Sequence, residues 1–393
     1  MKSGSSKTTS GGGALSCEKE MDWADNLPTA DAGRFAAVFA VLEQAIRSRA
    51  FPGCAFGVMA GGAVVLDGAA GRFTYEADAP EVTPETVFDV ASITKVAATT
   101  AATMLLVERG ELDIETPLGD LLPGFVAGRA ADDAARRVTL HHLLAHNSGL
   151  PGYAEFFKTA TTPDALMDEC LRLKLEAEPG ARAEYSDPGF ILLGKALEVK
   201  MGEGLAPGVS REVFEPLGMT ATRFCPAPEL RNSIPPTEED TWFRMRLIQG
   251  EVQDENASVM GGVSGHAGLF SNVPDLLRFA KAIMDSHASG EKRKTAELFD
   301  RETVNRFSEQ QLPQGSSRAL GWDTPSGDST SGRHFSPHSI GHLGFSGCSL
   351  WIDLDKAVTI VLLTNRTWPD RKNRAIRQVW PAFHDAVREA IGN

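Results

Sequence analysis

The chain has 393 residues, of which 42% are hydrophobic and 23% are charged, so it can bury a sizeable core and is not a bulk-disordered chain. Its 39 Lys and Arg residues against 52 Asp and Glu residues give a formal net charge of −13, which argues against a nucleic-acid partner because phosphate binding needs a basic face. Five scattered cysteines without a Cys-x-x-Cys pair argue against a disulfide framework and a structural zinc site.

Residues 1–30 are rich in Ser, Thr, Gly and Lys, and we expect them to form a disordered leader. They lack the apolar stretch of roughly 7–15 residues that a secretory signal requires. A faint lipoprotein-like box at Ala14–Cys17 has no such stretch before it. No run approaches the ~18 apolar residues of a transmembrane helix. We therefore expect a cytoplasmic protein, or a periplasmic or exported one if the true start site lies elsewhere.

Both ends of the chain carry strand and helix patterns, while the middle is dominated by helical periodicity and Pro/Gly-rich loops. The expected elements of the two ends are a helix over Ala32–Ser48, a hairpin of Cys54–Met59 and Ala63–Leu66 around Gly61-Gly62, strands over Ser349–Leu354 and Ala357–Thr364, and a helix over Asn373–Ile391. This pattern predicts an α/β (α+β) protein with a sheet domain (31–91 plus 335–393) and an inserted, mostly helical domain (92–334). Thr324–Arg333, rich in Ser, Gly, Asp and Thr, is expected to be a mobile loop.

The pair Ser-x-x-Lys, which can activate a serine, occurs three times in the chain. The three matches are Ser16 with Lys19, Ser92 with Lys95, and Ser289 with Lys292. The first lies in the leader and the last in a charged surface stretch. Only Ser92 follows an apolar segment, Val87–Ala91, and opens a long apolar helix that ends before Gly110. Context therefore favours the second match.

The helix expected over Ser92–Arg109 has almost no polar face, so it should be buried. Lys95 in its first turn can reach the Ser92 hydroxyl, because positions i and i+3 share a face. A lysine held there can act as a base or stabilise an anion, and the first N–H groups of the helix suit a developing oxyanion. The alternative is that Ser92 is a helix N-cap and Lys95 extends to water.

Two further segments could belong to the same site. Tyr185 lies in a turn before the apolar run Phe190–Gly194, and its hydroxyl could point into a cleft or into solvent. The stretch Gly341–Gly347 precedes the strand Ser349–Leu354, and its glycines would allow a substrate backbone to approach a strand edge. The alternative for that stretch is an ordinary glycine-rich loop.

Together these segments resemble the serine β-lactamase and penicillin-binding-protein superfamily, which includes class C β-lactamases, DD-peptidases and related esterases. The resemblance covers roughly residues 35 to 390. The segments that carry it, besides Tyr185 and Gly341–Gly347, are Thr83–Lys95, Leu143–Pro151, Gly262–Phe270, Arg318–Trp322, Leu350–Leu354 and Leu362–Asn365. It implies a β-lactamase/transpeptidase-like fold, with an antiparallel sheet flanked by N- and C-terminal helices and the active site between the two domains.

The resemblance also implies roles for individual residues. Ser92 would attack the substrate carbonyl and become acylated, while Lys95 and Tyr185 would share the proton transfers. The backbone N–H groups of Ser92 and Phe345 would form the oxyanion hole. Residues at substrate-binding positions would be Asp187, His342 and Gly344. No metal and no organic cofactor is implied.

Two positions depart from the family pattern. Where many members have Lys and Thr on the strand motif, this chain has His342 and Leu343, and Asp187 replaces an Asn and so loses an amide donor. We therefore expect a serine hydrolase of small esters, peptides or β-lactam-like molecules, most simply a carboxylesterase or a DD-peptidase-like enzyme. The alternatives are a true β-lactamase and a catalytically silent peptidoglycan- or peptide-binding protein.

Other polar clusters have simpler explanations. His142 and His146 have metal-ligand spacing near His141, but without His-Glu-x-x-His we expect core or capping histidines rather than a zinc site. His266 is expected to support the floor of the pocket. The cluster Asp254-Glu255-Asn256 is expected to be an ordered loop near the cleft.

Overall fold

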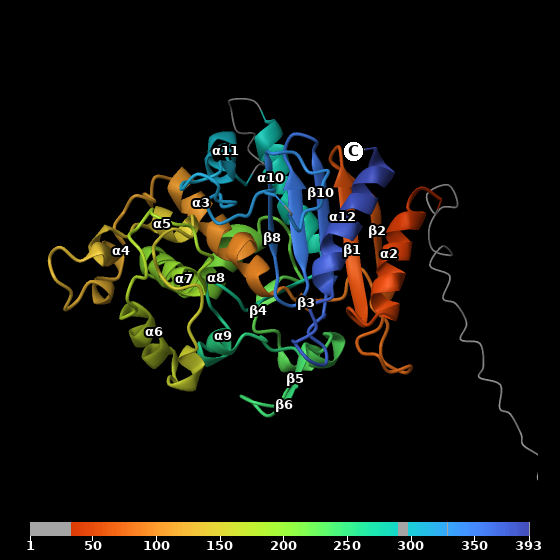
Figure 1. Ribbon diagram of the computed structural model, residues 1–393, viewed down its shortest axis with the longest axis horizontal. Helices are drawn as coiled ribbons and strands as arrows, with labels where there is room; N and C mark the ends of the chain where they lie inside the picture. Colours follow the sequence, from red (N-terminus) through yellow and green to blue (C-terminus); the bar gives the residue numbers. More distant parts are fainter. Residues whose placement is uncertain (1–32, 290–297, 328, 393) are drawn as a thin grey trace, which may run out of the picture.

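The computed structural model describes residues 33–289, 298–327 and 329–392, and the expected leader (1–30), Cys17 and Lys292 lie outside this part. A central antiparallel sheet stands beside a mostly helical region (Figure 1). The helices are α2 (Ala36–Arg47), α3 (Ala101–Glu108), α4 (Leu118–Leu121), α5 (Leu140–Leu144), α6 (Pro163–Leu171), α7 (Asp187–Met201), α8 (Leu205–Val209), α9 (Glu255–Val259), α10 (Val273–Ala288), α11 (Arg301–Ser308) and α12 (Ile376–Ile391). The strands are β1 (Gly53–Ala60), β2 (Ala63–Gly71), β3 (Phe88–Asp89), β4 (Arg223–Phe224), β5 (Glu238–Asp240), β6 (Arg246–Ile248), β7 (Leu269–Ser271), β8 (Ser339–Leu343), β9 (Ser349–Asp353) and β10 (Val358–Thr364).

The central sheet has the strand order β2-β1-β10-β9-β8, so both ends of the chain contribute to it, as the sequence predicted. The β1–β2 hairpin turns at Gly61 and Gly62, whose φ angles of 58° and 83° suit a tight two-residue turn. β1 then pairs with β10 over its length, from Cys54 opposite Thr364 to Ala60 opposite Val358. This pairing joins the two ends of the chain into one sheet.

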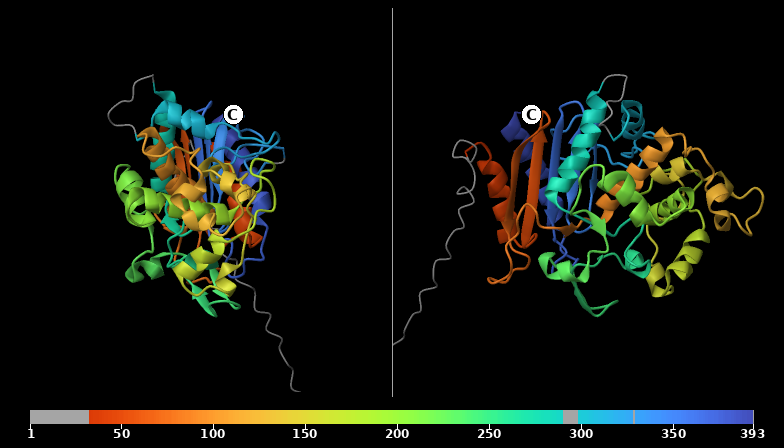
Figure 2. Two further views of the ribbon diagram at one scale, coloured as in Figure 1. Left: turned by 90° about the vertical axis from the view of Figure 1, so that its left-hand side faces the viewer. Right: turned by 180° about the vertical axis from the view of Figure 1, so that it is seen from behind.

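Helices cover both faces of the sheet. Because side chains alternate along a strand, Phe56 and Val58 of β1 face the core with α2 and α12, whereas Ala55 and Met59 belong to the other core. That second core includes Val273 and Leu277 of α10. Figure 1 and the reverse view in Figure 2 show α2 and α12 on one face and α10 on the other.

The chain between β2 and β8 forms the helical region, a small sheet of order β3-β7-β4, and a separate hairpin of β5 and β6. α10 lies within the segment expected to form the helical domain (92–334), yet it packs on the central sheet. The two-domain division therefore stays a prediction. The described residues of the expected loop Thr324–Arg333 form neither helix nor strand, and its mobility also stays a prediction.

A buried ion pair ties α12 to the sheet. The Arg388 guanidinium donates to the Asp353 carboxylate at 2.9 Å, and both side chains are at most 1% exposed. The same carboxylate accepts hydrogen bonds from Ser336 and from the backbone N–H of Lys356. A buried carboxylate needs such partners, because losing its charged donor leaves an uncompensated charge.

Replacing Arg388 by Ala should lower the free energy of unfolding by about 3–5 kcal/mol, since Asp353 would stay buried without its counter-ion. The matched control is Arg377→Ala on the exposed face of the same helix, which should change stability by no more than about 0.5 kcal/mol. Urea unfolding followed by circular dichroism measures both. Equal effects of the two substitutions would show that the ion pair does not hold α12 in place.

Candidate active site

Ser92 follows a strained turn at the end of β3. Ala91 has φ of 47°, a left-handed conformation that costs energy for a residue with a side chain. The Asp89 carboxylate holds this turn, because it accepts the Ala91 N–H at 2.8 Å and the Gln253 N–H at 2.8 Å. Burial raises the pKa of Asp89 to about 6, although both hydrogen bonds oppose the shift. The turn before Ser92 is thereby fixed to the loop around Gln253.

The helix that follows is less regular than the sequence predicted. Ala91–Ile93 forms one 3₁₀ turn, Lys95–Thr100 is a wider π segment, and α3 completes the helix up to the left-handed Gly110 at φ 67°. All residues of the π segment are buried, as expected for an apolar helix. Such segments occur often at functional sites.

Lys95 is fully buried, and its ammonium group has three acceptors. They are Asp187 Oδ1 at 2.7 Å, the His266 carbonyl at 3.0 Å and Ser92 Oγ at 3.1 Å. Burial lowers the pKa of Lys95, but the charge of Asp187 and its hydrogen bond outweigh burial, so the pKa is raised. Lys95 is therefore a charged ammonium at neutral pH. It does not extend to water, the alternative left open by the sequence.

Tyr185 completes the cluster around Ser92. Its hydroxyl donates to Ser92 Oγ at 2.8 Å, and burial raises its pKa, so it is a neutral phenol at neutral pH. Tyr185 precedes α7, which Ser186 caps by accepting the Gly189 N–H. Asp187, which follows Ser186, contacts Lys95. The start of α7 therefore provides a hydrogen-bond partner for Ser92, which is Tyr185, and one for Lys95, which is Asp187.

The segment Gly344–Ser346 lies against the residues before Ser92. A Cβ on Gly344 would lie 2.4 Å from the Val90 carbonyl oxygen, so only glycine fits there. The Ser346 hydroxyl donates to the Asp89 carbonyl at 2.7 Å. Phe345, between them, is half exposed. This packing brings the two expected oxyanion-hole residues, Ser92 and Phe345, onto neighbouring segments, and their role stays a prediction.

His342 lies in the edge strand β8, so the stretch predicted to be either strand edge or loop is a strand up to Leu343. Its Nδ1 is 2.8 Å from the Leu343 carbonyl, while its buried Nε2 has no hydrogen-bond partner among the described residues. Burial, together with the charges of Lys95 and Arg318, lowers the pKa of His342 to about 3. The imidazole is therefore neutral at physiological pH.

Three further histidines near the site form hydrogen bonds with neighbouring residues. His142 caps α5 by a reciprocal pair of hydrogen bonds with Thr139, which confirms the capping prediction. His146 Nδ1 accepts the Ser186 N–H at 3.0 Å, and its ring contacts Tyr185. His266 Nε2 is 2.9 Å from Asp254 Oδ1. In residues 33–289, 298–327 and 329–392, no cluster of His, Cys, Asp or Glu is arranged to hold a metal.

Two contributors to this geometry were not identified from the sequence. Asp89 lies in the apolar segment Val87–Ala91, and a lone acid in such a segment could have indicated a buried, hydrogen-bonded carboxylate. Arg318 places its guanidinium 5.3 Å from the centre of the Tyr185 ring. Arg318 belongs to Arg318–Trp322, one of the segments that carry the family resemblance, so a positively charged side chain near the site could have been expected there.

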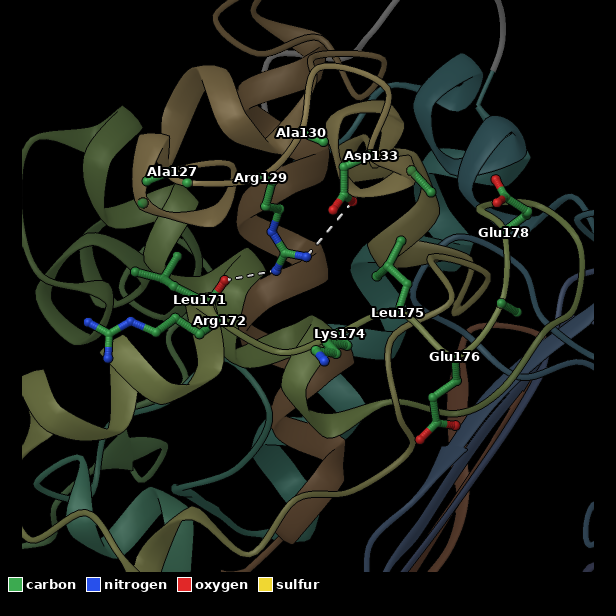
Figure 3. Close-up of a pocket in the computed structure, with 14 residues that line it drawn as sticks. Ala127, Arg129, Ala130, Asp133, Leu171, Arg172, Lys174, Leu175, Glu176 and Glu178 are labelled. Atoms are coloured by element: carbon green, nitrogen blue, oxygen red, sulfur yellow. Dashed lines mark hydrogen bonds and ion pairs between the residues drawn. The ribbon is translucent and has the colours of Figure 1, made fainter.

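A hollow of about 800 Å³ lies in the helical region (Figure 3). Its walls come from residues 124–134 and 171–178. Arg129 in its wall donates to the carbonyls of Phe125, Leu171 and Leu173 and faces Asp133. Its guanidinium therefore stabilises the backbone segments around the hollow. None of the predicted site residues lines this hollow.

The helices in the described part of the chain are too short or too polar to span a bilayer.

Comparison with known proteins places the chain among hydrolases that share this fold. A family model described as Beta-lactamase matches residues 38–381. A relative from Escherichia coli K12, named "Putative D-alanyl-D-alanine carboxypeptidase", is 31% identical over 312 residues, which are 73% of this chain and 70% of the relative. A Bacillus subtilis relative named "N-acetylmuramyl-L-alanine amidase" is 30% identical over 72% of this chain and 68% of its own length.

Among solved structures, "EstCE1, a hydrolase with promiscuous acyltransferase activity" superposes with a TM-score of 0.72 at 21% identity, covering 92% of this chain and all of the other. At that identity the similarity shows the fold alone. The expected antiparallel sheet with flanking helices and a helical insertion is thereby confirmed as a fold class.

The lowered pKa of His342 has a consequence for stability. The unfolded chain binds a proton at this side chain below pH ~6.5, whereas the folded chain does not until about pH 3, so acid favours unfolding. His342→Gln should therefore reduce the stability lost between pH 7 and pH 5 by about 2 kcal/mol.

Urea unfolding of both proteins at pH 7 and pH 5 measures this difference. The control is His338→Gln, whose side chain is 76% exposed in the native protein and which should keep the wild-type acid sensitivity. An unchanged loss of stability in His342→Gln would mean that this imidazole is protonated in the folded protein well above pH 3.

Proposed function

Because the chain belongs to the Beta-lactamase family, we propose that it is a serine hydrolase that cleaves ester or amide bonds through an acyl-enzyme formed on Ser92. The observation that carries this proposal is the position of Ser92 Oγ, which lies 3.1 Å from Lys95 Nζ and 2.8 Å from the Tyr185 hydroxyl. A nucleophile within hydrogen-bond reach of two proton-transfer groups is the arrangement that covalent catalysis requires. A silent binding protein would not need it.

The hydrogen bonds support a division of the proton transfers in acylation. Lys95 is charged and donates to Asp187, so it accepts the Ser92 proton only as it passes one of its own to the Asp187 carboxylate. Tyr185, a neutral phenol, gives its proton to the leaving group. A proton then returns from Asp187 through Lys95 to Tyr185, which restores the cluster with no net gain or loss.

The transition state also needs stabilisation of the carbonyl oxygen. The backbone N–H groups of Ser92 and Phe345 are proposed to donate to it as it becomes negative. Gly344, packed against Val90, supports this assignment, because it sets the distance between the two segments. For deacylation, the same Lys95 and Tyr185 are proposed to activate a water molecule.

The substrate class follows from two side chains. Leu343 offers no side-chain hydrogen bond for a substrate carboxylate. The Asp187 carboxylate forms an ion pair with Lys95, and unlike an asparagine amide it cannot donate a hydrogen bond to the substrate. These features favour an esterase over an efficient β-lactamase, whereas the DD-peptidase-like activity is supported by the names of the relatives. The names of the two relatives, a D-alanyl-D-alanine carboxypeptidase and an N-acetylmuramyl-L-alanine amidase, support small peptides and their derivatives as substrates.

Ser92→Ala should abolish hydrolysis of p-nitrophenyl acetate, with kcat/KM falling at least about 10³-fold, because the acyl-enzyme cannot form. Ser289→Ala, which changes another Ser-x-x-Lys serine, is the matched control and should keep wild-type activity. Release of p-nitrophenol measures both. Equal activity of wild type and Ser92→Ala would refute the proposed nucleophile and favour the binding-protein alternative.

Asp187→Asn tests the role of the counter-ion. Without the carboxylate, burial is no longer outweighed, so the pKa of Lys95 should fall. The limb of the pH dependence of kcat/KM that reports loss of the Lys95 proton should then move from alkaline pH towards neutrality by more than one pH unit. The control Asp67→Asn, at an exposed position of β2, should leave the profile unchanged. An unshifted limb in Asp187→Asn would show that Asp187 is not the group that keeps Lys95 charged.

A further inference from the structure

Three large aromatic side chains are exposed in the described part of the chain, and all three gather at one place. They are Tyr153 (46% exposed), Trp242 (47%) and Phe345 (50%). The Arg371 guanidinium lies 5.3 Å from the Trp242 ring centre and 5.9 Å from that of Phe345, and it also acts electrostatically on Tyr153. We call these three side chains the aromatic rim.

The aromatic rim adjoins the segments that hold Ser92. Phe345 directly follows Gly344, which packs on Val90 two residues before Ser92. Tyr153 directly follows Gly152, whose carbonyl accepts the Asp187 N–H at 2.9 Å. Two members of the rim therefore directly follow residues that contact the segments around the candidate nucleophile, one at the turn before Ser92 and one at the start of α7.

The third member, Trp242, is presented by a rigid turn of the β5–β6 hairpin, which projects from the body of the molecule in Figure 1. The buried Asp240 carboxylate accepts the backbone N–H groups of residues 242, 243 and 244 at 3.1, 2.8 and 3.0 Å. Arg244 then donates to the carbonyls of Val252 and Gln253. Gln253 is the residue whose N–H binds Asp89 below Ser92, so the Trp242 turn and the nucleophile share one support.

The charges around the aromatic rim restrict what can bind there. Arg371 forms ion pairs with Glu238 and Glu255, so its positive charge is already compensated. An anionic group would meet Glu255, and a cationic group would meet the guanidinium that already lies against two of the rings. A neutral group with a flat face fits best, because aromatic rings pack favourably against other rings. The Trp242 side chain, held edge-on by Phe157 at 5.3 Å, still leaves nearly half of its surface open.

We propose that the aromatic rim is a subsite for a neutral ring, aryl or sugar, carried by the substrate that acylates Ser92. This inference rests on the proposed function and adds the substrate class to it. Stacking on Trp242 and Phe345 would hold the ring while the reacting carbonyl lies between Ser92 and the Phe345 N–H. Open-chain substrates of the same size would lack this contact.

The test compares two p-nitrophenyl esters whose acyl groups both have eight carbons, the phenylacetate and the octanoate. Wild type should prefer the phenylacetate, and Trp242→Ala should lower the ratio of kcat/KM for phenylacetate over octanoate about tenfold. The nitrophenyl leaving group is common to both esters, so the ratio reports the acyl ring and cancels losses of folded protein. Trp242→Phe should keep most of the preference. Leu247→Ala, an exposed apolar change on the same hairpin, should leave the ratio unchanged.

A ratio unaltered by Trp242→Ala, or no preference in wild type, would overturn the subsite. Equilibrium titration of Ser92→Ala with phenylacetamide and with methyl N-acetylglucosaminide separates this outcome from failure of the proposed function. Binding of the amide supports an aryl ring, binding of the glycoside supports a sugar ring, and either should be lost when Trp242→Ala is added. If a ring compound binds but wild type hydrolyses no ester, the proposed hydrolase function is contradicted and the proposed subsite is supported. If neither ring compound binds, the proposed subsite is contradicted.

Discussion

The buried ammonium group of Lys95 is the constraint on which the site depends. Moving a lone ammonium from water into a protein interior costs several kcal/mol, so each of its protons needs an acceptor. One acceptor, Ser92, lies three residues before Lys95, whereas the other two come from distant parts of the chain: Asp187 at the start of α7 and the His266 carbonyl in the loop before β7. Satisfying one charge therefore brings together Ser92, the turn that carries Tyr185 and the loop before β7.

Around this charge, hydrogen bonds hold the neighbouring backbone segments in place. The Asp89 carboxylate ties the strained Ala91 turn to Gln253, and the Asp89 carbonyl receives the Ser346 hydroxyl from the segment of the expected oxyanion hole. A buried carboxylate that accepts two N–H groups and a glycine without room for a side chain leave these segments little freedom. The function proposed for Ser92 thus also depends on Asp89, whose carboxylate and carbonyl are both occupied by hydrogen bonds to neighbouring segments.

Much of this architecture could be predicted from the sequence, because alternating apolar residues and glycine turns are local signals. The β1–β2 hairpin, the strands β9 and β10, the terminal helices and the buried helix after Ser92 were found in this way. The π segment at Lys95–Thr100, the pairing of Lys95 with Asp187 and the role of Asp89 were not. The last two depend on contacts between residues far apart in the chain, such as Asp89 with Gln253, which no local pattern reveals. The aromatic rim was missed for the same reason, since Arg371 lies against the rings of Trp242 and Phe345, which come from separate segments of the chain.

The central claim, that Ser92 is the residue that becomes acylated, is tested most directly by mapping a trapped intermediate. Wild-type protein is mixed with an activated ester, quenched in acid within the first turnovers and digested with trypsin. The peptide Phe73–Lys95 contains Ser92 as its only serine, so mass spectrometry can assign the acyl group to that side chain. The account predicts that Phe73–Lys95 gains the mass of the acyl group and that fragmentation places it on Ser92. An acyl group on another peptide, with Phe73–Lys95 unmodified while the ester is being consumed, would contradict it.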